Sequence, residues 1–487
     1  MAFGFAKTIE TVALLVWCAL LLPYAQAWTA PITAKGNKFF YSDTGNEFRL
    51  KGMAYYPRPN TGEMASVSNY DWTADEHEDV WMDHLDVMQD LGVNTIRLYS
   101  IDPSKSHDKF MCACSNRGIY VLVGFTAPCA NCSIIDELPP KCYPDSLFTR
   151  AQMVYNAMAV YDNTLGFSVG NENNLQMLHG AKGVTTAPCV KAFLRDTRNY
   201  ASNCAGSLRQ VPIGLDIADI PPREQWLRYY DCEINNDEHT RADCCSPPLV
   251  SLIYLVFRLG FNPYVECNPR SHTEYKHSTG LQNLMAEYAA TAYSRPIMFG
   301  EFGCNEGENT IDGYENQRSF YDARWMNEET EMTNEIVGGN VFEFTTEVMN
   351  LQKTKKLTRS KDPGKFGVGY FAPDDCDHSK KKCTFMPYPE YGNLKAAYTK
   401  TEASKVTLQS FEPTRKKALT CPKGVSTALP GTPRVKQLSC SAAKPVCDDK
   451  NVNRGGNARE KSTTKSGSSA DTAAVATIVA SAVRIMM

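Results

Sequence analysis

The feature that most constrains the fold of this chain is the alternation of short apolar runs with longer amphipathic segments. Stretches such as EHEDVWMDHLDVMQDLG place Val80, Leu85, Val87, Met88 and Leu91 at near-helical spacing. Seven or eight strand candidates separated by helices predict a parallel α/β sheet. The clearest runs are FRLKGMAYY (48–56), GVNTIRLYS (92–100), GIYVLVGF (118–125), LGFSVGN (165–171), QVPIGLDI (210–217), RPIMFGEFG (295–303) and GGNVFEF (338–344).

A chain of 487 residues with this many alternations is most economically closed as a (β/α)8 TIM barrel. A doubly wound open sheet is the main alternative. No glycine-rich phosphate loop follows the first strand candidate, which argues against the dinucleotide-binding form of that alternative. We therefore expect a barrel over residues 28–400, followed by a small cysteine-containing segment over residues 401–452.

The two ends of the chain indicate export to the cell surface. Lys7 precedes a long apolar stretch and Ala25-Gln26-Ala27 offers a small-residue cleavage pattern, so residues 1–27 are predicted to be a secretory signal. Residues 453–470 are rich in Gly, Ser and Thr and are expected to form a disordered stalk. The apolar tail 471–487 is short for a membrane span and is predicted to be a GPI-anchor signal. A frayed soluble terminus is the alternative for this tail.

The cysteine content also favours an oxidising compartment. Of the 18 cysteines, Cys18 lies in the predicted signal, and the remaining odd number implies at least one free or intermolecular thiol. The CANC stretch from Cys129 to Cys132 is better interpreted as half of an extracellular disulfide framework than as a zinc or redox site. Cys421, Cys440 and Cys447 indicate a small disulfide-tied segment. The same CANC loop holds the one predicted N-glycosylation acceptor, Asn131.

The charge pattern gives no indication of a nucleic-acid partner. The net charge is −3, and the basic run KTKKLTRSK (353–361) is typical of a solvated loop. If a lipid anchor is attached, it is the only membrane contact that the sequence predicts.

Two carboxylates stand directly after or at the end of apolar runs. Asn171 and Glu172 follow LGFSVG, and Glu301 follows RPIMFG. In a barrel of parallel strands the carboxyl ends of all strands lie at the same mouth, where the active site of such a barrel is found. We therefore expect Glu172 and Glu301 to face one another.

A facing pair of carboxyl groups can divide the work of cleaving a glycosidic bond. One is protonated and supplies the leaving oxygen, and the other is ionised and attacks the anomeric carbon. An amide such as that of Asn171 suits a contact with the sugar 2-hydroxyl. The structural alternatives are a helix N-terminal acid for Glu172 and a salt-bridged rim carboxylate for Glu301.

The residues that carry these features also resemble a known family. The stretches KGMAYYPRP, NTIRLYSIDPSKSHD, RGIYVLVGFTAP, LGFSVGNENN, NPYVEC, RPIMFGEFGCN and GGNVFEFTTE occur with the wording and order of glycoside hydrolase family 72. This family comprises surface-anchored β-1,3-glucanosyltransferases of fungal and fungus-like cell walls. The similarity covers residues 32–371.

By this resemblance, Glu172 matches the general acid/base and Glu301 the nucleophile of a (β/α)8 barrel enzyme. Tyr99, Asn171 and Tyr264 fall on motif positions that line the sugar site. The resemblance further implies that Cys267 and Cys304 form a disulfide. Aromatic platforms for an acceptor sugar are expected among Tyr55, Tyr56, Tyr264 and Phe344, although a packing role is an equal alternative for each.

Three positions depart from the family pattern. Gly124 stands where an Asp is usual, Tyr56 stands where a Gln is usual, and Glu266 replaces the usual aromatic residue before the cysteine in NPYVEC. Both catalytic carboxylates are present, which argues against a chain that has lost activity. The donor sugar site is nevertheless expected to be partly rebuilt.

The resemblance implies a retaining β-1,3-glucanosyltransferase that needs no metal or cofactor. Such an enzyme cleaves a β-1,3-glucan donor internally and transfers the new reducing end to the non-reducing end of an acceptor glucan, which elongates and remodels the cell wall. Two alternatives remain open at this point. One is a β-glucan hydrolase that uses the same two residues, and the other is a surface protein that binds glucan without cleaving it.

Overall fold

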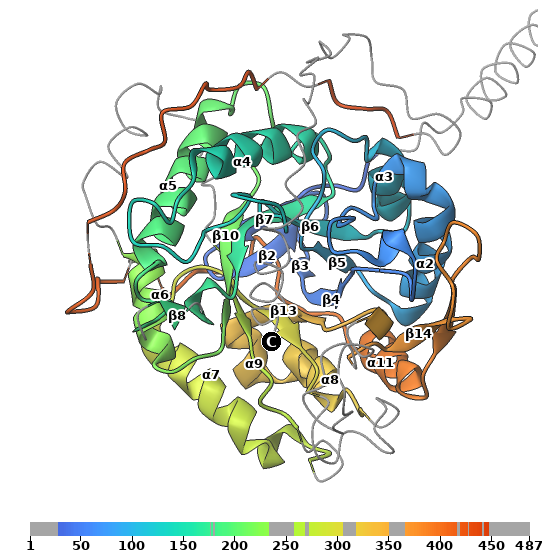
Figure 1. The fold of residues 1–487 in the computed structure, drawn as a ribbon. Coiled ribbons are helices and arrows are strands. Elements are labelled where there is room, and N and C mark those ends of the chain that lie inside the picture. Colours follow the sequence, from blue (N-terminus) through green and yellow to red (C-terminus); the bar gives the residue numbers. More distant parts are fainter. Residues whose placement is uncertain are drawn as a thin grey trace, which may run out of the picture.

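The computed structural model describes residues 28–175, 177–178, 181–232, 258–267, 272–304, 318–349, 366–415, 419–426, 428–440 and 443–447. At its centre is a closed barrel of parallel strands, surrounded by helices (Figure 1). The (β/α)8 barrel prediction is confirmed, and the doubly wound alternative was wrong because the sheet closes. The barrel strands are β4 (Leu50–Ala54), β5 (Thr95–Leu98), β6 (Tyr120–Gly124), β7 (Thr164–Asn171), β10 (Ile213–Ala218), β11 (Leu259–Asn262), β12 (Ile297–Phe302) and β13 (Ile336–Val341).

Each barrel strand pairs in parallel with its neighbours in chain order, and β13 pairs with β4 to close the barrel. Helices on the outside cover the sheet (Figure 1). They are α2 (Glu78–Leu91), α3 (Asp108–Asn116), α4 (Asp145–Met158), α5 (Ala187–Asn203), α6 (Arg223–Asp231), α7 (Thr279–Thr291), α8 (Tyr321–Glu328), α9 (Thr330–Glu335) and α11 (Glu390–Thr399). Single 3-10 turns are η1 (Glu63–Ala65), η2 (Asp75–His77), η3 (Asn173–Leu175) and η5 (Tyr275–His277).

Each of the seven apolar runs overlaps a barrel strand. The strand that the pattern did not single out is β11, which is only four residues long, contains Gly260 and is followed by Pro263. A short strand with a glycine inside and a proline after it carries little β-signal of its own. Its place in the barrel comes from pairing with β10 and β12.

Helix α2 shows why the amphipathic segments form helices. Val80, Leu85, Met88 and Leu91 are buried, as the helical spacing predicts. The helix ends at Gly92, whose left-handed backbone (φ 78°) lets its N–H reach the carbonyls of the last turn. The chain then enters β5 at once, which is the short connection that a βα barrel requires.

A small antiparallel sheet closes the amino-terminal end of the barrel. It consists of β1 (Ile32–Lys35), β2 (Lys38–Tyr41) and β3 (Glu47–Phe48). Phe39 and Phe48 of this sheet share a buried cluster with Leu50, Tyr120 and Leu165, which lie at or near the starts of β4, β6 and β7. The carboxyl ends of the strands are therefore the end available for a site. Two further two-stranded sheets are β8 (Met177–Leu178) with β9 (Ala181–Lys182), and β14 (Gly369–Ala372) with β15 (Thr384–Pro387).

The cysteine-containing C-terminal segment is tied to the barrel. Each of its cysteines pairs with a cysteine in or directly after a helix of the barrel: Cys421 with Cys232, Cys440 with Cys204 and Cys447 with Cys112. The segment runs around the outside of the helices, coloured orange to red in Figure 1. Because its attachments are spread along the barrel, it does not build a core of its own.

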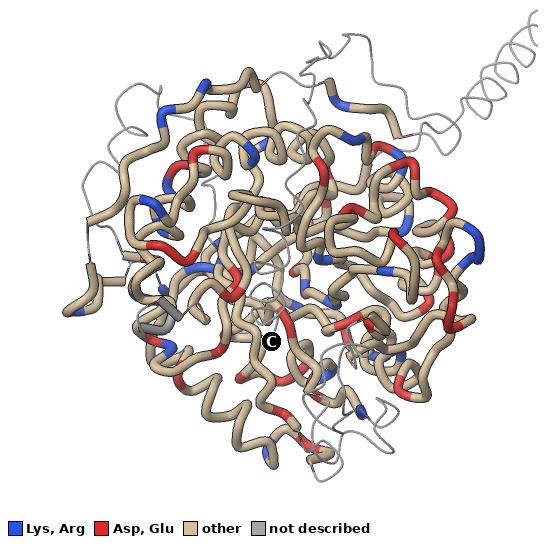
Figure 2. The backbone as a smooth tube through the Cα atoms, in the orientation of Figure 1, with Lys and Arg blue, Asp and Glu red and all other residues tan. Residues whose placement is uncertain are grey.

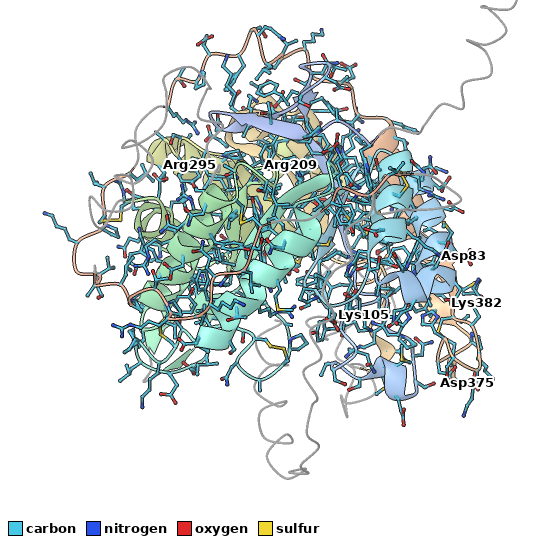
Figure 3. The ribbon with its side chains drawn as sticks, turned by 90° about the horizontal axis from the view of Figure 1, so that it is seen from above. Asp83, Lys105, Arg209, Arg295, Asp375 and Lys382 are labelled. Carbon is cyan, nitrogen blue, oxygen red and sulfur yellow. A yellow bond between two sulfur atoms is a disulfide. The ribbon has the colours of Figure 1, made fainter. Side chains whose placement is uncertain are left out.

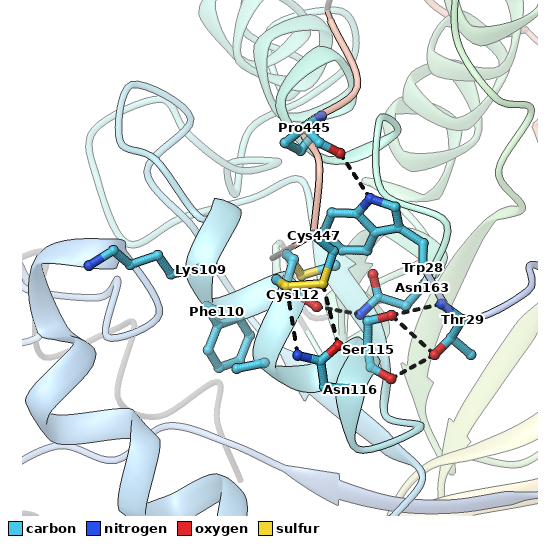
Figure 4. Close-up of a disulfide and its surroundings, with 12 residues drawn as sticks. Trp28, Thr29, Lys109, Phe110, Cys112, Ser115, Asn116, Asn163, Pro445 and Cys447 are labelled. Atoms are coloured by element: carbon cyan, nitrogen blue, oxygen red, sulfur yellow. Dashed lines mark hydrogen bonds between the residues drawn. A yellow bond between two sulfur atoms is a disulfide. The ribbon is translucent and has the colours of Figure 1, made fainter. Parts of the chain in front are cut away.

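The last of these attachments also fixes the start of the described chain. Figure 4 shows Trp28 beside the Cys112–Cys447 disulfide, with its indole N–H donating to the carbonyl of Pro445 at 2.9 Å. Thr29 and Ser115 exchange hydrogen bonds beside it. The two ends of the described chain are thus joined at helix α3.

The disulfides agree with the oxidising compartment inferred from the sequence. The described residues contain seven disulfide bonds, and Cys114 is buried without one. Such a density is typical of exported proteins. Cys129 and Cys132 bond to each other, so the CANC loop closes on itself and does not form half of a larger framework.

Charged residues of both signs are interspersed around the helices (Figure 2). Figure 3 shows one surface ion pair, Asp83 of α2 with Lys382, whose Nζ lies 2.6 Å from the carboxylate. Such exposed pairs contribute about 0–1 kcal/mol each. Among the described residues, no helix is long and apolar enough to cross a membrane. The predicted signal, stalk, anchor signal and the basic run 353–361 lie outside the described residues.

Candidate active site

The predicted carboxylates lie at the carboxyl ends of their strands. Glu172 follows the last residue of β7, and Glu301 lies near the end of β12. Tyr99 follows β5, and Tyr264 lies two residues beyond β11. Four separate strands therefore bring these side chains to one end of the barrel.

Glu172 is held in an unusual backbone conformation. Its φ of 53° is in the left-handed region, which few residues other than glycine adopt. Its N–H donates to the carbonyl of Asp216 on β10 at 2.9 Å, and its own carbonyl accepts from Leu175 at 2.9 Å. Strained backbone of this kind persists where the surroundings fix it, and it concentrates at functional sites.

The Glu172 carboxyl group lies in surroundings that favour its protonated form. Burial, and next the negative charge of Glu301, raise the pKa of Glu172 to about 8. Asn262 donates to Oε1 at 2.8 Å, and this hydrogen bond opposes the shift without reversing it. At neutral pH the group therefore holds the proton that a general acid needs.

Glu301 lies in surroundings of the opposite kind. Its Oε1 accepts hydrogen bonds from Arg97 Nη1 and from the Tyr99 hydroxyl, each at 2.7 Å. Its Oε2 accepts from the Tyr264 hydroxyl at 2.9 Å. Three donors, one of them cationic, thus bind both oxygens of this carboxylate and hold them in place. Burial, followed by the charge of Glu301, raises the pKa of both tyrosines well above the usual value, so both keep the proton that they donate.

Arg97 links Glu301 to Asn171, the residue that precedes Glu172. Besides Glu301, its guanidinium donates to Asn171 Oδ1 at 2.8 Å, and Asn262 donates to the same oxygen at 3.2 Å. These contacts identify the oxygen of the Asn171 amide and leave its NH₂ as the group that can donate to a ligand. The guanidinium also lies over the ring of Tyr99, 4.6 Å from its centroid.

For two of the four candidate aromatic platforms, Tyr55 and Phe344, the structure supports the alternative packing role. Tyr55 and Phe344 are 2% and 0% exposed and pack against each other at 5.4 Å between ring centroids. The hydroxyl of Tyr55 is engaged with His84 at 2.9 Å. Neither ring has a face open to a sugar, because both belong to the core. Tyr56 is half-buried, and the Arg58 guanidinium lies 5.5 Å from its ring centroid.

The structure gives a physical account of two departures from the family pattern. A Cβ atom on Gly124 would lie 2.0 Å from the carbonyl oxygen of Tyr99, so this backbone leaves no room for a side chain there. Glu266 is buried, lies 3.0 Å from His272 Nδ1 and accepts from the Ser278 hydroxyl. Its carboxylate is thus engaged in holding the loop that carries Tyr264.

Sequence reasoning missed Arg97, Asn262 and Glu343. Arg97 could have been found, because residues two apart in a strand face the same side and Arg97 precedes Tyr99 by two. The same spacing relates Asn262 to Tyr264. Glu343 lies just beyond β13 and is buried; burial, and next the charge of Glu347, raise the pKa of its carboxyl well above the usual range.

The predicted disulfide between Cys267 and Cys304 is confirmed. It joins the loop after Tyr264 to the end of β12, three residues beyond Glu301. The disulfide therefore fixes the tyrosine that donates to Glu301 Oε2 relative to the carboxylate that accepts. Among the described residues, no group of three or more His, Cys, Asp or Glu side chains is arranged to hold a metal ion.

Replacing Cys267 and Cys304 together by serine is expected to lower both stability and activity. The bond closes a loop across a sequence separation of 37, for which the loss in free energy of unfolding is about 3–4 kcal/mol. Glycan cleavage should fall about 10-fold or more, because Tyr264 is no longer held against Glu301. Thermal unfolding and steady-state rates measure the two effects. The matched control replaces Cys376 and Cys383, a separation of 7, and should leave the rate unchanged; equal rates in both variants would contradict the role assigned to the bond.

Comparison of the sequence with known proteins identifies relatives of this chain. A family model described as glucanosyltransferase matches residues 22–361. The chain is 28% identical over 434 residues to a 1,3-beta-glucanosyltransferase of Arthroderma benhamiae, and 30% identical over 321 residues to the 1,3-beta-glucanosyltransferase gel1 of Aspergillus fumigatus. These alignments cover 86% and 66% of this chain. They span 67% and 60% of the two relatives' own length, and 57% of a third relative, GAS5 of Saccharomyces cerevisiae.

The fold is similar to that of solved structures as well. Saccharomyces cerevisiae Gas2p in complex with laminaripentaose superposes with a TM-score of 0.61 at 26% identity. The superposition covers 83% of this chain and 78% of that protein. The ligand in that structure is a laminari-oligosaccharide.

Proposed function

This chain belongs to the glucanosyltransferase family, glycoside hydrolase family 72, and from this membership and the geometry of the site we propose that it is a retaining β-1,3-glucanosyltransferase. The observation that carries the proposal is the contrast between two buried carboxyl groups. Glu172 is held protonated, whereas both oxygens of Glu301 accept hydrogen bonds from Arg97, Tyr99 and Tyr264. Carboxyl groups whose environments differ in this way identify the acid and the nucleophile of a glycosidase.

In the first half of the reaction, a Glu301 oxygen forms a bond to the anomeric carbon of the donor while the glycosidic C–O bond breaks. The departing oxygen takes the proton of Glu172, which leaves that carboxyl ionised. Arg97, Tyr99 and Tyr264 position Glu301 for attack. The product is a glucan fragment released with a new non-reducing end, and a covalent glycosyl-enzyme that carries the other fragment.

In the second half, the ionised Glu172 acts as a base. It takes the proton of an acceptor hydroxyl as the acceptor oxygen bonds to the anomeric carbon and Glu301 departs. Two displacements at the same carbon leave its configuration unchanged. Asn171, through the NH₂ group that faces away from Arg97, is proposed to bind the sugar 2-hydroxyl.

Transfer and hydrolysis share the first half-reaction, so product analysis separates them. Incubation with one defined laminari-oligosaccharide, followed by mass spectrometry, is expected to give products both longer and shorter than the substrate. Only shorter products would indicate a β-glucan hydrolase. Binding of the oligosaccharide without any new product would indicate a non-catalytic surface protein and would overturn the proposal.

We further propose that the protein acts at the cell surface. Removal of residues 1–27, a stalk over residues 453–470, attachment of a GPI anchor with loss of residues 471–487, and glycosylation at Asn131 together describe the mature chain. The seven disulfides support passage through an oxidising compartment. Release of the protein from intact cells by a phosphatidylinositol-specific phospholipase tests the anchor, and the mass of the released protein tests the cleavage sites.

A further inference from the structure

A second buried ion pair lies inside the barrel, close to the site. Asp216 on β10 and Arg258, which precedes β11, are 0% and 1% exposed. Arg258 Nη1 lies 2.9 Å from Asp216 Oδ1, and Nη2 lies 3.3 Å from Oδ2. Burying two charges is costly unless each is well paired, so a pair at this depth needs an explanation.

The neighbouring strands make room for this pair. A Cβ atom on Gly260 would lie 1.9 Å from Asp216 Oδ1, and a Cβ atom on Gly214 would lie 2.3 Å from Arg258 Cγ. No side chain could replace hydrogen at either position without displacing the pair. The Asp216–Arg258 pair is therefore accommodated by the residues on both strands that carry it.

Asp216 also faces the active-site arginine. Its Oδ2 lies 3.5 Å from Arg97 Nη2, the nitrogen that donates to Asn171, while Arg97 Nη1 donates to Glu301. One guanidinium is thus shared between two carboxylates, Glu301 toward the mouth and Asp216 toward the interior. Burial by itself would raise the pKa of Asp216, but the charges of Arg258 and Arg97 bring it down to about 2, so this carboxylate is ionised at every pH of interest.

These side chains border a small cavity at this end of the barrel. The residues that line it include Arg97, Gly124, Asn171, Asp216 and Arg258. Gly124, on the strand β6 across the cavity, cannot carry a side chain here. Asp216 is the only acidic residue among those that line the cavity. It is therefore the source of the negative charge that meets Arg97 from inside the barrel.

We propose that Asp216 is a positioning residue for the reaction: it holds the Arg97 guanidinium in the orientation in which one nitrogen meets the nucleophile Glu301 and the other meets Asn171. Arg258 holds Asp216 in place and balances its charge. This inference rests on the proposed function, since it assigns Asp216 to the support of the same nucleophile. Asp216 is 0% exposed, so we assign it to holding Arg97 and not to binding a sugar.

The alternative is that Asp216 only neutralises Arg258, and a double variant separates the two roles. Asp216→Asn alone leaves Arg258 without a counter-charge and leaves Glu301 as the remaining carboxylate partner of Arg97. Asp216→Asn combined with Arg258→Met removes both charges of the pair and keeps the volume. We expect the double variant to melt near the wild-type temperature and yet to lose about 10- to 100-fold in kcat on laminari-oligosaccharides, with KM changed less than about threefold.

The matched control is Asp231→Asn combined with Arg295→Met. Asp231 and Arg295 form a partly buried ion pair at 3.0 Å between the last residue of α6 and the residues just before β12, and Arg295 lies at the outside of the barrel (Figure 3). This control should keep kcat. Wild-type kcat in the folded Asp216 and Arg258 double variant would overturn the inference and leave the proposed function standing. A wild-type protein without activity on any laminari-oligosaccharide would instead overturn the proposed function.

A crystal structure of the same double variant gives a readout that needs no substrate. Without Asp216, the Arg97 guanidinium is expected to turn so that the 2.8 Å contact between Nη2 and Asn171 Oδ1 is lost. An unchanged guanidinium in that structure would also overturn the inference.

Discussion

Replacing Glu301 by glutamine is expected to reduce the cleavage of laminari-oligosaccharides by at least about 10³-fold. The amide has nearly the shape of the carboxylate but cannot form the covalent bond to the anomeric carbon, and removal of a catalytic nucleophile costs most of the rate. The contacts from Arg97, Tyr99 and Tyr264 need an acceptor, which the amide oxygen supplies for only one side. Initial rates from chromatography of the products measure the loss.

The control for this variant is Glu274→Gln, the same substitution at an exposed side chain that pairs with Lys276. It should leave the rate within about twofold of wild type, as expected for an exposed position. Isothermal titration calorimetry with laminaripentaose should still detect binding to the Glu301 variant, because the rest of the site is intact. Normal turnover in the Glu301 variant would remove the basis for the nucleophile assignment.

The parts of the fold that could be predicted are those determined by local pattern. Seven apolar runs identified seven barrel strands, and the helical spacing in α2 identified its buried face. Strand β11 was not predicted, because a segment of four residues that includes a glycine is too short to give a recognisable hydrophobic pattern. The proposed catalytic pair, Glu172 and Glu301, could be predicted for the same local reason, since a carboxylate at the end of an apolar run is easily recognised.

Sequence alone could not say which aromatic residues are open to an acceptor sugar, because this depends on which of two neighbouring side chains is buried in the core. Tyr55 and Tyr56 are adjacent residues just beyond β4, and sequence alone does not say which of the two is buried. Tyr55 proved to be the buried one, packed against His84 and Phe344. Composition made both tyrosines equally good candidates.

Long-range pairings are the second class of feature that sequence could not supply. The bond between Cys112 and Cys447 spans a separation of 335 residues (Figure 4), and the connectivity of many cysteines cannot be deduced from spacing. Asp216 and Arg258 are 42 residues apart and meet only when β10 and β11 pair. An aspartate inside the run QVPIGLDI looks like an interruption of a strand until its partner is known.

The pH dependence of activity is expected to report Glu172 directly. Burial, and next the charge of Glu301, raise the pKa of Glu172 from an ordinary value of about 4.3 to about 8. A general acid acts only while protonated, so kcat/KM should hold up to about pH 8 and fall tenfold per pH unit above it. Glu172→Gln, which cannot donate the proton, should lower kcat by about 10²- to 10⁴-fold and abolish this basic limb.

Coupling between the two carboxyl groups gives the sharpest form of this test. The negative charge of Glu301 is one of the two causes that raise the pKa of Glu172, so Glu301→Gln should move the Glu172 titration to lower pH. Burial remains in that variant, so the midpoint should stay above the ordinary value. Carbon-13 NMR of labelled glutamate side chains follows the titration without any turnover, with Glu172→Gln used to assign the signal. A midpoint near 4.3 in the wild-type protein would mean that Glu172 is ionised at neutral pH and cannot be the general acid. This conclusion would hold whatever the Glu301→Gln variant shows.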